Sequence, residues 1–208
     1  MKQRITVAGF GIFIFALFFF FSYLVAREVF VQFDFDTTVR LQDNVSARLD
    51  DLFSFLSLIG HFEPVTIFLF LLLIFYRKIR GIFTVFFYGL FHAIEIFGKA
   101  FVDQLPPPEF MLRTKKLIEF PQFYIREEFS YPSGHAGRAA FITTLIGLML
   151  VKSKRLSRTH KLIFILLLII YDISMFISRI YLGEHWIADV VGGMLLGASL
   201  GLLSFAIL

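Results

Sequence analysis

The chain is organised by residues 162–208, which read LIFILLLIIYDISMFISRIYLGEHWIADVVGGMLLGASLGLLSFAIL. Two apolar runs, 162–180 and 186–208, are each close to the length of about 20 residues that a helix needs to cross the hydrocarbon of a bilayer. Polar residues gather in the connection between them, within 178–189. The stretch therefore predicts two membrane-spanning helices joined by a short turn that carries ionisable side chains.

That turn combines a cation, an imidazole and a carboxylate. If the residues after Gly183 open a helix, His185 and Asp189 stand at positions i and i+4 on one face, within hydrogen-bonding reach. The carboxylate would then take one ring N–H and leave the other imidazole nitrogen free to attack an electrophile. Arg179, at the end of the preceding helix, presents a planar guanidinium suited to an oxyanion. The alternative is a turn at the membrane interface with ordinary anchoring charges.

The composition of the whole chain is typical of a membrane protein. Of 208 residues, 58% are hydrophobic and 30 are phenylalanine, and the mean hydropathy is +0.79. A soluble domain of this length could not bury so much apolar surface. The formal net charge of +4 comes from short basic clusters beside apolar runs, so no nucleic-acid partner is predicted. Cysteine is absent from the sequence, which excludes disulfides, thiolate metal sites and a cysteine nucleophile.

Apolar runs recur along the chain and predict an all-α bundle of six transmembrane helices in a single domain, 1–208. The first run is read as a retained helix, because it is long and Leu24-Val25-Ala26 is a poor cleavage site for a signal peptidase. The expected helices lie at about 5–26, 52–76, 81–102, 136–151, 162–180 and 186–208. In the last helix, a small-xxx-small ridge for close helix packing is formed by Gly193, Gly197 and Gly201.

The segment between the first two runs predicts an amphipathic helix. Asp36 supplies N-cap chemistry near its start. The apolar residues fall on one helical face, at positions Leu41, Val45, Leu49, Leu52 and Leu56. We expect this helix to lie on the membrane surface in the first outer loop and to lead into the second span, which Pro64 would kink.

The basic residues orient the predicted spans. The N-terminus and the turns at 77–80 and 152–161 lie on one side and are almost purely basic, whereas the opposite loops mix acids and bases. By the positive-inside rule both termini are cytoplasmic. Lys99, the 103–135 loop and the 178–189 turn then all face the extracytoplasmic side of a multi-pass protein of the plasma (inner) membrane.

A second group of polar residues, Tyr131-Pro132-Ser133-Gly134-His135, precedes the fourth predicted span. Ser133 is a natural N-cap, and the first backbone N–H groups of a helix have no internal partner. Such a helix start binds phosphate readily, and Gly134 would let a ligand approach the backbone closely. His135 could then donate a proton to a leaving oxygen. The alternative is an ordinary N-cap turn.

Together these segments resemble the type 2 phosphatidic acid phosphatase superfamily, membrane lipid phosphatases whose active sites are related to those of vanadium haloperoxidases. The family carries three blocks, Lys-x6-Arg-Pro, Pro-Ser-Gly-His and Ser-Arg-x5-His-x3-Asp. The second block matches as Pro132-Ser133-Gly134-His135, and the third matches as Ser178-Arg179, His185 and Asp189. Block order, spacing and the predicted six-span topology also agree, so the resemblance covers essentially the whole chain.

The first block departs from the family pattern. Lys99 and Pro107 match its two ends, but Pro106 replaces the arginine between them. We expect another cation to take the place of this arginine, and we favour Arg113 because the proline run ends close before it. Further candidates are Lys115, Lys116, Arg126 and Arg138.

The resemblance implies a metal-independent phosphatase without a cofactor, which works through a phosphohistidine. His185 is the implied nucleophile, Asp189 orients it, and His135 protonates the leaving oxygen and later activates water. The implied phosphate ligands are Lys99, Ser133, the Gly134 backbone and Arg179. The carboxylates of the chain are also too few and scattered for a two-metal clamp.

Acids inside two predicted spans are additions of this particular sequence. Glu95 shares a helical stripe with His92 and Lys99, and it could set the orientation of Lys99. Asp172 could do the same for Arg179, two turns further along the chain. Polar contacts between helices would explain both acids equally well. A separate histidine near the start of the second span, His61, is expected to lie at the membrane interface.

A site at the outer face of an embedded chain predicts an amphiphilic phosphate from the outer leaflet. The candidates are phosphatidic acid, phosphatidylglycerol phosphate, undecaprenyl or another polyprenyl pyrophosphate, and lipid A-type phosphates. We expect the basic, aromatic loop 109–128 to cover the headgroup. A phosphotransferase would keep the same blocks, and a catalytically impaired relative that binds lipid phosphates would account for Pro106. The oligomeric state is left open.

Overall fold

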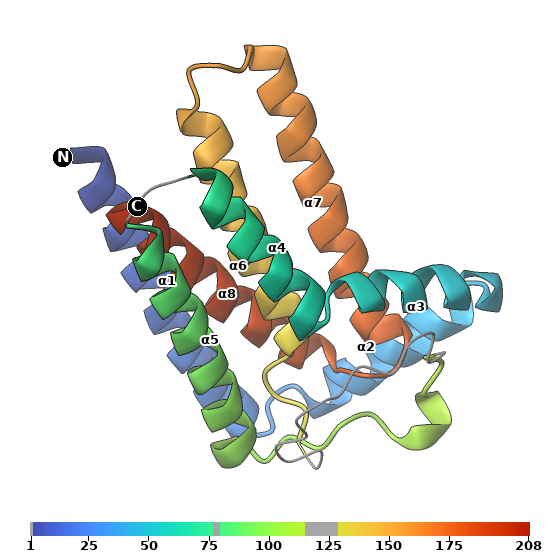
Figure 1. Cartoon of the computed structure of the whole chain (residues 1–208). Helices are drawn as coiled ribbons and strands as arrows, with labels where there is room; N and C mark the ends of the chain where they lie inside the picture. The colour runs from blue at the N-terminus through green and yellow to red at the C-terminus, as the bar shows by residue number, and fades with distance from the viewer. Residues whose placement is uncertain (1, 77–79, 115–128) are drawn as a thin grey trace.

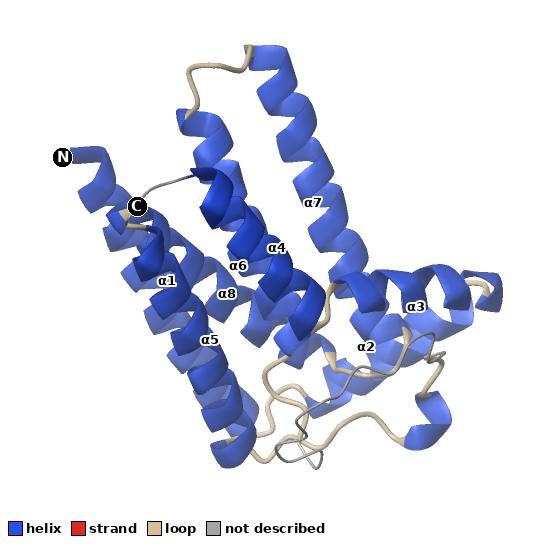
Figure 2. Cartoon of the chain, viewed as in Figure 1, coloured by secondary structure: helices blue, strands red, loops and turns tan. Residues whose placement is uncertain are grey.

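The computed structural model describes residues 2–76, 80–114 and 129–208. Within these ranges the chain contains helices and no strand, which confirms the predicted all-α class (Figures 1 and 2). The α-helices are α1 (Lys2–Ala26), α2 (Val31–Asn44), α3 (Asp50–Ile59), α4 (Phe62–Tyr76), α5 (Gly81–Phe101), α6 (Gly134–Lys152), α7 (Arg158–Tyr181) and α8 (Ile187–Ile207). Short 3₁₀ turns lie at Ala47–Leu49 and Glu109–Met111.

Five helices, α1, α5, α6, α7 and α8, are long and apolar enough to cross a membrane. They coincide with five of the predicted spans. The expected span at 52–76 is divided between α3 and α4, which meet at a bend of 50°. The number of candidate spans among the described residues is six only if α3 and α4 are counted as one bent span. The break lies at Gly60 and His61 rather than at Pro64, which sits in the first turn of α4, where a proline costs no helical hydrogen bond. The expected kink at Pro64 is therefore wrong in position.

The predicted amphipathic helix is also divided. Backbone helical geometry stops after Asn44, and the side chain of Ser46 accepts a hydrogen bond from the Arg48 backbone to start the next turn. The apolar positions that suggested one continuous helix are consequently shared between α2 and α3. Asp36 lies inside α2, which begins at Val31, so the expected N-cap at Asp36 is wrong.

The two ends of the bundle differ in what they carry (Figure 1). Both termini, the end of α4, the start of α5 and the α6–α7 connection lie at one end. The helices α2 and α3 lie across the opposite end, together with the α7–α8 connection and the described parts of the α5–α6 connection (Figure 1). The basic turn at 152–161 and the polar turn at 178–189 are thus at opposite ends, as the predicted topology requires. The side of the membrane that each end faces stays a prediction.

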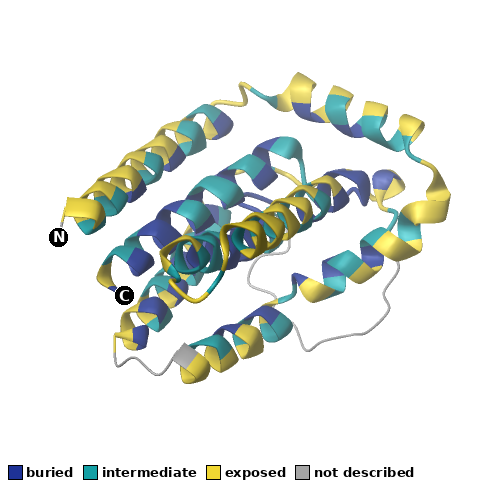
Figure 3. Cartoon of the chain, turned by 90° about the horizontal axis from the view of Figure 1, so that it is seen from above, coloured by how far each residue is buried: buried dark blue, intermediate teal, exposed yellow. Residues whose placement is uncertain are grey.

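The core of the bundle lies around α8, which packs against α6 and α1. Its glycine ridge is the reason for the close approach to α6. A Cβ at Gly193 would overlap the carbonyl oxygen of Ser133, and one at Gly197 would overlap that of Gly137. The predicted ridge is therefore confirmed as a close helix contact. Buried residues gather toward the middle of the bundle, while exposed residues lie along its outer faces (Figure 3).

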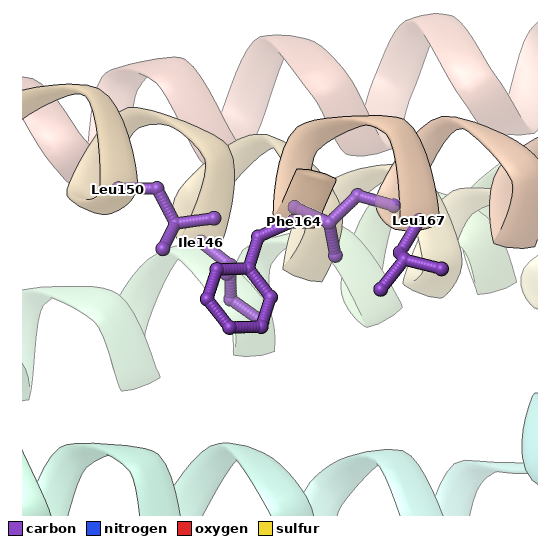
Figure 4. Close-up of a pocket in the computed structure, with 5 residues that line it drawn as sticks. Ile146, Leu150, Phe164 and Leu167 are labelled. Carbon is purple, nitrogen blue, oxygen red and sulfur yellow. The ribbon is translucent and has the colours of Figure 1, made fainter. Parts of the chain in front are cut away.

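Large apolar side chains cover the outer faces of α1, α4 and α7, as expected for helices that contact lipid. An apolar groove also runs between α6 and α7, lined in part by Ile146, Leu150, Phe164 and Leu167 (Figure 4). Its residues lie in the half of both helices nearer the α6–α7 connection. The groove is lined by apolar side chains and includes none of the residues of the polar motifs, which form the site described next.

Candidate active site

The Pro-Ser-Gly-His segment begins α6 and is fixed to α8 through its backbone. Ser133 is fully buried and is the N-cap of α6, with its hydroxyl accepting from the Ala136 backbone at 3.5 Å. This confirms the predicted helix start. The Ser133 N–H donates to the carbonyl oxygen of Asp189 at 3.0 Å. The two motifs, more than 40 residues apart in the sequence, are therefore joined directly.

The turn between α7 and α8 has a defined backbone. Gly183 adopts a φ of +69°, and a Cβ there would overlap the carbonyl oxygen of Met111. After it, the backbone N–H groups of Glu184 and His185 both donate to the carbonyl oxygen of Arg179 at 3.2 Å. These bonds close the end of α7 and set the direction from which His185 enters the site.

His185 and Asp189 are in contact as predicted, but not on one helical face, because α8 begins at Ile187 and His185 precedes it. The Nδ1 atom of His185 lies 3.3 Å from Oδ2 of Asp189, which is fully buried. The same oxygen accepts from the Trp186 backbone N–H at 2.9 Å, so Asp189 also caps the first turn of α8. The carboxylate is held by the helix that carries it, and it leaves the Nε2 atom of His185 as the free ring nitrogen.

Arg179 lies beside this pair and is completely buried. Its Nε atom is 3.4 Å from the Ser178 hydroxyl, and its Nη1 atom forms an ion pair with Glu184. The remaining nitrogen, Nη2, is buried and has no hydrogen-bond partner among the described residues. A buried cation with one nitrogen left without a partner is suited to an oxyanion.

Glu184 is a site residue that the sequence analysis did not identify. One carboxylate oxygen pairs with Arg179, and the other accepts a hydrogen bond from the hydroxyl of Thr114. Burial pushes the pKa of Glu184 upward, but the Arg179 guanidinium and the Thr114 hydrogen bond outweigh it and hold the pKa below its ordinary value. Glu184 is therefore a stable anion next to the proposed phosphate ligand.

His135 stands in the first turn of α6 and meets the break between α3 and α4. Its ring lies edge-on to the ring of His61, with 4.9 Å between the centroids. The absence of a side chain at Gly60 gives the His135 ring its space. His135 is close enough to Arg179, Arg138 and His185 to experience their charges. The expectation that His61 is only interfacial missed this contact, since no local pattern links residues 61 and 135.

A second polar network occupies the α5 side of the site. The carboxylate of Glu95 lies 3.0 Å from His92 Nδ1 and 3.7 Å from the Nη1 atom of Arg138. Arg138 is buried and donates from Nε to the carbonyl oxygen of Gly60 at 3.1 Å. The Glu95 carboxylate lies where a Cβ of Gly134 would be, so the space at Gly134 that was expected to admit a ligand admits this carboxylate.

Lys99 is placed next to the Pro-Ser-Gly-His segment by its neighbour in α5. A Cβ at Gly98 would lie 2.6 Å from Cδ of Pro132, so the end of α5 closes directly on that proline. Lys99 itself is half-buried. The contacts described for Glu95 are with His92 and Arg138, and the pairing of Glu95 with Lys99 stays a prediction.

Arg113, the favoured substitute for the missing arginine, has its described contacts with Tyr181. Its Nη1 atom lies 3.2 Å from the Tyr181 hydroxyl, and the guanidinium carbon is 5.2 Å from the centre of that ring. The other loop candidates, Lys115, Lys116 and Arg126, lie outside the described residues, as does the loop 109–128 beyond Thr114.

Two acids, the half-buried Asp172 and the buried Asp34, link different helices. Asp172 accepts from the Thr143 hydroxyl at 2.7 Å and so joins α7 to α6, which fits the alternative of a polar contact between helices. Asp34 of α2 accepts from the Ala188 backbone N–H at 2.9 Å and from Gln104 at 3.2 Å. Burial raises the pKa of Asp34 to about 6 despite these hydrogen bonds. The sequence analysis did not single out Asp34, whose main partner lies 154 residues away.

The loop that contains Pro106 folds over the start of α8. The Trp186 indole N–H donates to the carbonyl oxygen of Leu105 at 2.7 Å, and the Ser130 backbone donates to that of Gln104 at 2.9 Å. Pro106 is exposed while Pro107 is buried. The position of the missing arginine is thus close to the site in the fold, and the proline there offers no charge.

The helices described here define an integral membrane bundle with a polar site at one end. The model of the PAP2 superfamily matches residues 79–208. The chain is also 32% identical over 188 residues to the undecaprenyl-diphosphatase of Sulfolobus acidocaldarius, a match that covers 88% of this chain and 82% of that protein. The chain therefore belongs to the PAP2 superfamily.

Further comparisons agree with this family. Over 132 residues the chain is 30% identical to phosphatidylglycerophosphatase B of Bacillus subtilis, covering 63% of this chain and 58% of the length of that relative. The crystal structure of a PAP2-type phosphatidylglycerolphosphate phosphatase from Bacillus subtilis matches with a TM-score of 0.74 at 22% identity, covering 93% of both chains. That of Aquifex aeolicus LpxE matches with a TM-score of 0.60 at 24% identity, covering 82% of this chain and 93% of that chain. These two structures establish the shared fold.

Proposed function

We propose that the protein is a membrane-embedded lipid phosphatase that hydrolyses a phosphomonoester or a diphosphate of an amphiphilic substrate. The observation that carries the proposal is the His185–Asp189 contact next to the buried, incompletely paired Arg179, with His135 entering from the adjoining helix. The set combines a nucleophile, its orienting carboxylate, an oxyanion ligand and an acid. Membership of the PAP2 superfamily supports the same reaction class.

In the first step, the Nε2 atom of His185 attacks phosphorus in line with the departing oxygen. An N–P bond forms while the P–O bond to the lipid breaks, and His135 gives its proton to the leaving oxygen. Asp189 holds the Nδ1–H of His185 and stabilises the positive charge that develops on the ring. In the second step His135 takes a proton from water, which attacks the phosphohistidine and releases phosphate and free His185.

The remaining groups bind the oxygens of the transferred phosphoryl group. Arg179, Lys99, Ser133 and the first backbone N–H groups of α6 supply fixed positive charge and hydrogen-bond donors. This type of electrostatic stabilisation is the main task of the protein in phosphoryl transfer. We propose that the reaction needs no metal ion, so full activity in the presence of a chelator is the expected result.

Pro106 stands where the superfamily carries an arginine, so another cation has to supply that positive charge. The described contacts favour Arg138 over Arg113 for this role. Arg138 is buried one turn after His135, and its charge acts on His135 and Arg179. The contacts of Arg113 are instead with Tyr181. We therefore propose that Arg138 compensates for Pro106, with Glu95 setting its direction.

The substrate class follows from the membrane setting and from what the relatives are named for. One relative is a phosphatidylglycerophosphatase and another an undecaprenyl-diphosphatase, so a monoester and a diphosphate are both within the range of the superfamily. We propose that the substrate is drawn from the outer leaflet and that both termini are cytoplasmic. The basic turn at the end opposite the site supports this orientation (Figure 1).

Phosphate release by the purified protein tests the proposal. The panel should contain phosphatidic acid, phosphatidylglycerol phosphate, a polyprenyl diphosphate and a lipid A-type phosphate, each with His185→Ala as the control. We expect release from at least one lipid, unaffected by chelator and absent in the variant. Binding of lipid phosphates without release would favour a catalytically impaired relative, for which Pro106 is the specific observation.

A further inference from the structure

Glu184 is the one acidic side chain among the described residues that forms an ion pair with Arg179. Neither the superfamily blocks nor the proposed mechanism gives this carboxylate a task. It immediately precedes His185 in the sequence, and it reaches back to the guanidinium across the turn that Gly183 forms. Glu184 therefore contacts the guanidinium group that is proposed to bind the substrate phosphate.

The nitrogens of Arg179 decide what the phosphate can reach. Nε is directed to the Ser178 hydroxyl, Nη1 is engaged by Glu184, and Nη2 is buried without a partner among the described residues. An arginine binds phosphate most strongly through two parallel N–H···O bonds, which require two nitrogens of the fork. With Nε directed to Ser178, a parallel pair of bonds has to use Nη1 and Nη2, and at Nη1 the phosphate would share the nitrogen with the Glu184 carboxylate.

Charge makes this sharing unfavourable. A phosphate group and the Glu184 carboxylate are both anions, and two anions at one guanidinium repel each other strongly in a site largely shielded from water. The Glu184 side chain is only 22% exposed, so solvent screens little of this repulsion. Substrate binding must therefore weaken the Arg179–Glu184 pair or be weakened by it.

The outer loop offers Glu184 a second partner. The Thr114 hydroxyl donates to the carboxylate oxygen that does not face Arg179. Thr114 is held beside the turn because the neighbouring Arg113 N–H donates to the Leu182 carbonyl at 2.9 Å. The Gln42 amide adds bonds of 2.8 Å to the carbonyl oxygens of Met111 and Tyr181. Thr114 can therefore keep hold of Glu184 after the carboxylate has left the arginine.

We propose that Glu184 is an exchangeable internal ligand of Arg179, which occupies the arginine fork in the free protein and is displaced to Thr114 by the phosphate of the substrate. Glu184 then lowers the affinity of the site for any phosphate-like anion without taking part in the chemical step. The inference rests on the proposed phosphatase function, because it takes Arg179 as a ligand of the substrate phosphate.

The test compares inhibition by orthovanadate and the kinetics of lipid hydrolysis in the wild type and two variants. Glu184→Gln removes the competing charge, and Glu184→Asp keeps the charge on an arm too short to contact Arg179 and Thr114 together. Glu28→Gln is the matched control, since it removes the same charge from an exposed position outside the α7–α8 turn and the 109–128 loop. Vanadate inhibition constants, KM and kcat are measured for all four proteins at one ionic strength.

We expect Glu184→Gln to lower both the vanadate inhibition constant and KM by roughly tenfold, with kcat changed by less than about threefold. Glu184→Asp should shift both constants in the same direction by a smaller factor, and Glu28→Gln should leave them unchanged. If Glu184→Gln does not fold, Glu184→Asp decides the question alone, because it retains the charge opposite buried Arg179. A merely structural role for Glu184 would instead raise KM or lower kcat.

The failures of the two claims are distinguishable. If the wild type hydrolyses a lipid phosphate but both Glu184 variants leave the vanadate constant unchanged or raise it, the inference is overturned and the proposed function stands. If the wild type hydrolyses none of the lipids in the panel, the proposed function is overturned, and the inference with it.

Discussion

The two sides of the proposed phosphate site are built in different ways. On the α6–α8 side, the Ser133 N–H bonds to the backbone of Asp189, and Gly193 lets the two helices touch there. On the α5 side, the contacts are between side chains, chiefly Glu95 with Arg138, and the first motif lacks its arginine. The position of His185, the proposed nucleophile, is thus set by backbone packing. The positive charge on the α5 side depends instead on side-chain contacts, which a substitution can change.

The largest expected effect is on the α6–α8 side. Asp189→Asn removes the negative charge that stabilises the His185 ring, and the single amide atom that replaces Oδ2 must face both His185 Nδ1 and the Trp186 N–H. We expect kcat to fall by about 10⁴-fold, as in comparable His–Asp pairs, with little change in KM. The melting temperature in detergent serves as the control for folding. A loss below about tenfold would mean that the carboxylate does not orient the nucleophile.

Substitutions on the α5 side should have a smaller effect on catalysis, and they distinguish Arg138 from Arg113 as the cation that replaces the missing arginine. We expect Arg138→Ala to lower kcat/KM by about 30- to 100-fold, the loss of one strong charge-assisted contact. Arg138→Lys should recover part of it, because the charge remains. Arg113→Ala should change kcat/KM by less than about threefold. The reverse order of the two alanine variants would show that Arg113 replaces the missing arginine.

The packing that fixes the α6–α8 side can be tested by stability. Gly197→Ala places a methyl group against the backbone carbonyl of Gly137, so we expect a loss of about 1–3 kcal/mol in the free energy of unfolding. Gly89→Ala in α5 is the matched control, since nothing lies within 4 Å of a Cβ at that position. Reversible unfolding in mixed micelles measures both. Equal stability of the two variants would argue against a rigid α6–α8 contact.

The smallest expected effect concerns the hydrogen bond by which Asp34 of α2 joins the start of α8. The pKa of Asp34 is about 6 in the folded protein against an ordinary 3.8, so the folded state binds the proton more tightly. The resulting stability is present below about pH 4 and is lost as the pH rises through 6. Asp34→Asn does not titrate. The melting temperature of the wild type minus that of the variant should therefore increase as the pH falls from 7 to 5.

A constant difference between pH 7 and pH 5, or one that decreases toward pH 5, would contradict this account of Asp34. Asp36→Asn is a suitable control, because Asp36 lies on the same helix and its described contact is a local one with Gln32 at 2.8 Å. Its substitution should leave the pH dependence of the wild type unchanged.

The correctly predicted features are those that depend on residues close together in the sequence. The long apolar runs predicted α1, α5, α6, α7 and α8, because the length of a spanning helix is set by the bilayer. The spacing of His185 and Asp189 predicted their contact, although α8 begins only at Ile187, so the Asp189 carboxylate reaches back from the first turn to a His185 that precedes the helix. The N-cap at Ser133 followed from its side-chain chemistry.

The remaining features depend on contacts between elements, which helical periodicity does not contain. The break at Gly60 is at the place where α3 and α4 meet His135 and Met175. The direction of Arg138 depends on Glu95 of another helix, so its role could be named from the sequence only as one candidate among several. Nothing in the local sequence around Glu184 indicates its ion pair with Arg179, which depends on how the turn between α7 and α8 folds.

The most direct test of the central claim is whether a phosphoryl group is transferred to His185. The wild type is mixed with a lipid substrate carrying a radiolabelled phosphate, quenched within a single turnover and digested for mass spectrometry. We predict an acid-labile, alkali-stable phosphoryl group on the peptide that contains His185, and none in His185→Ala. Single-turnover release of phosphate without any labelled intermediate, or a label on another residue that persists in His185→Ala, would contradict the account.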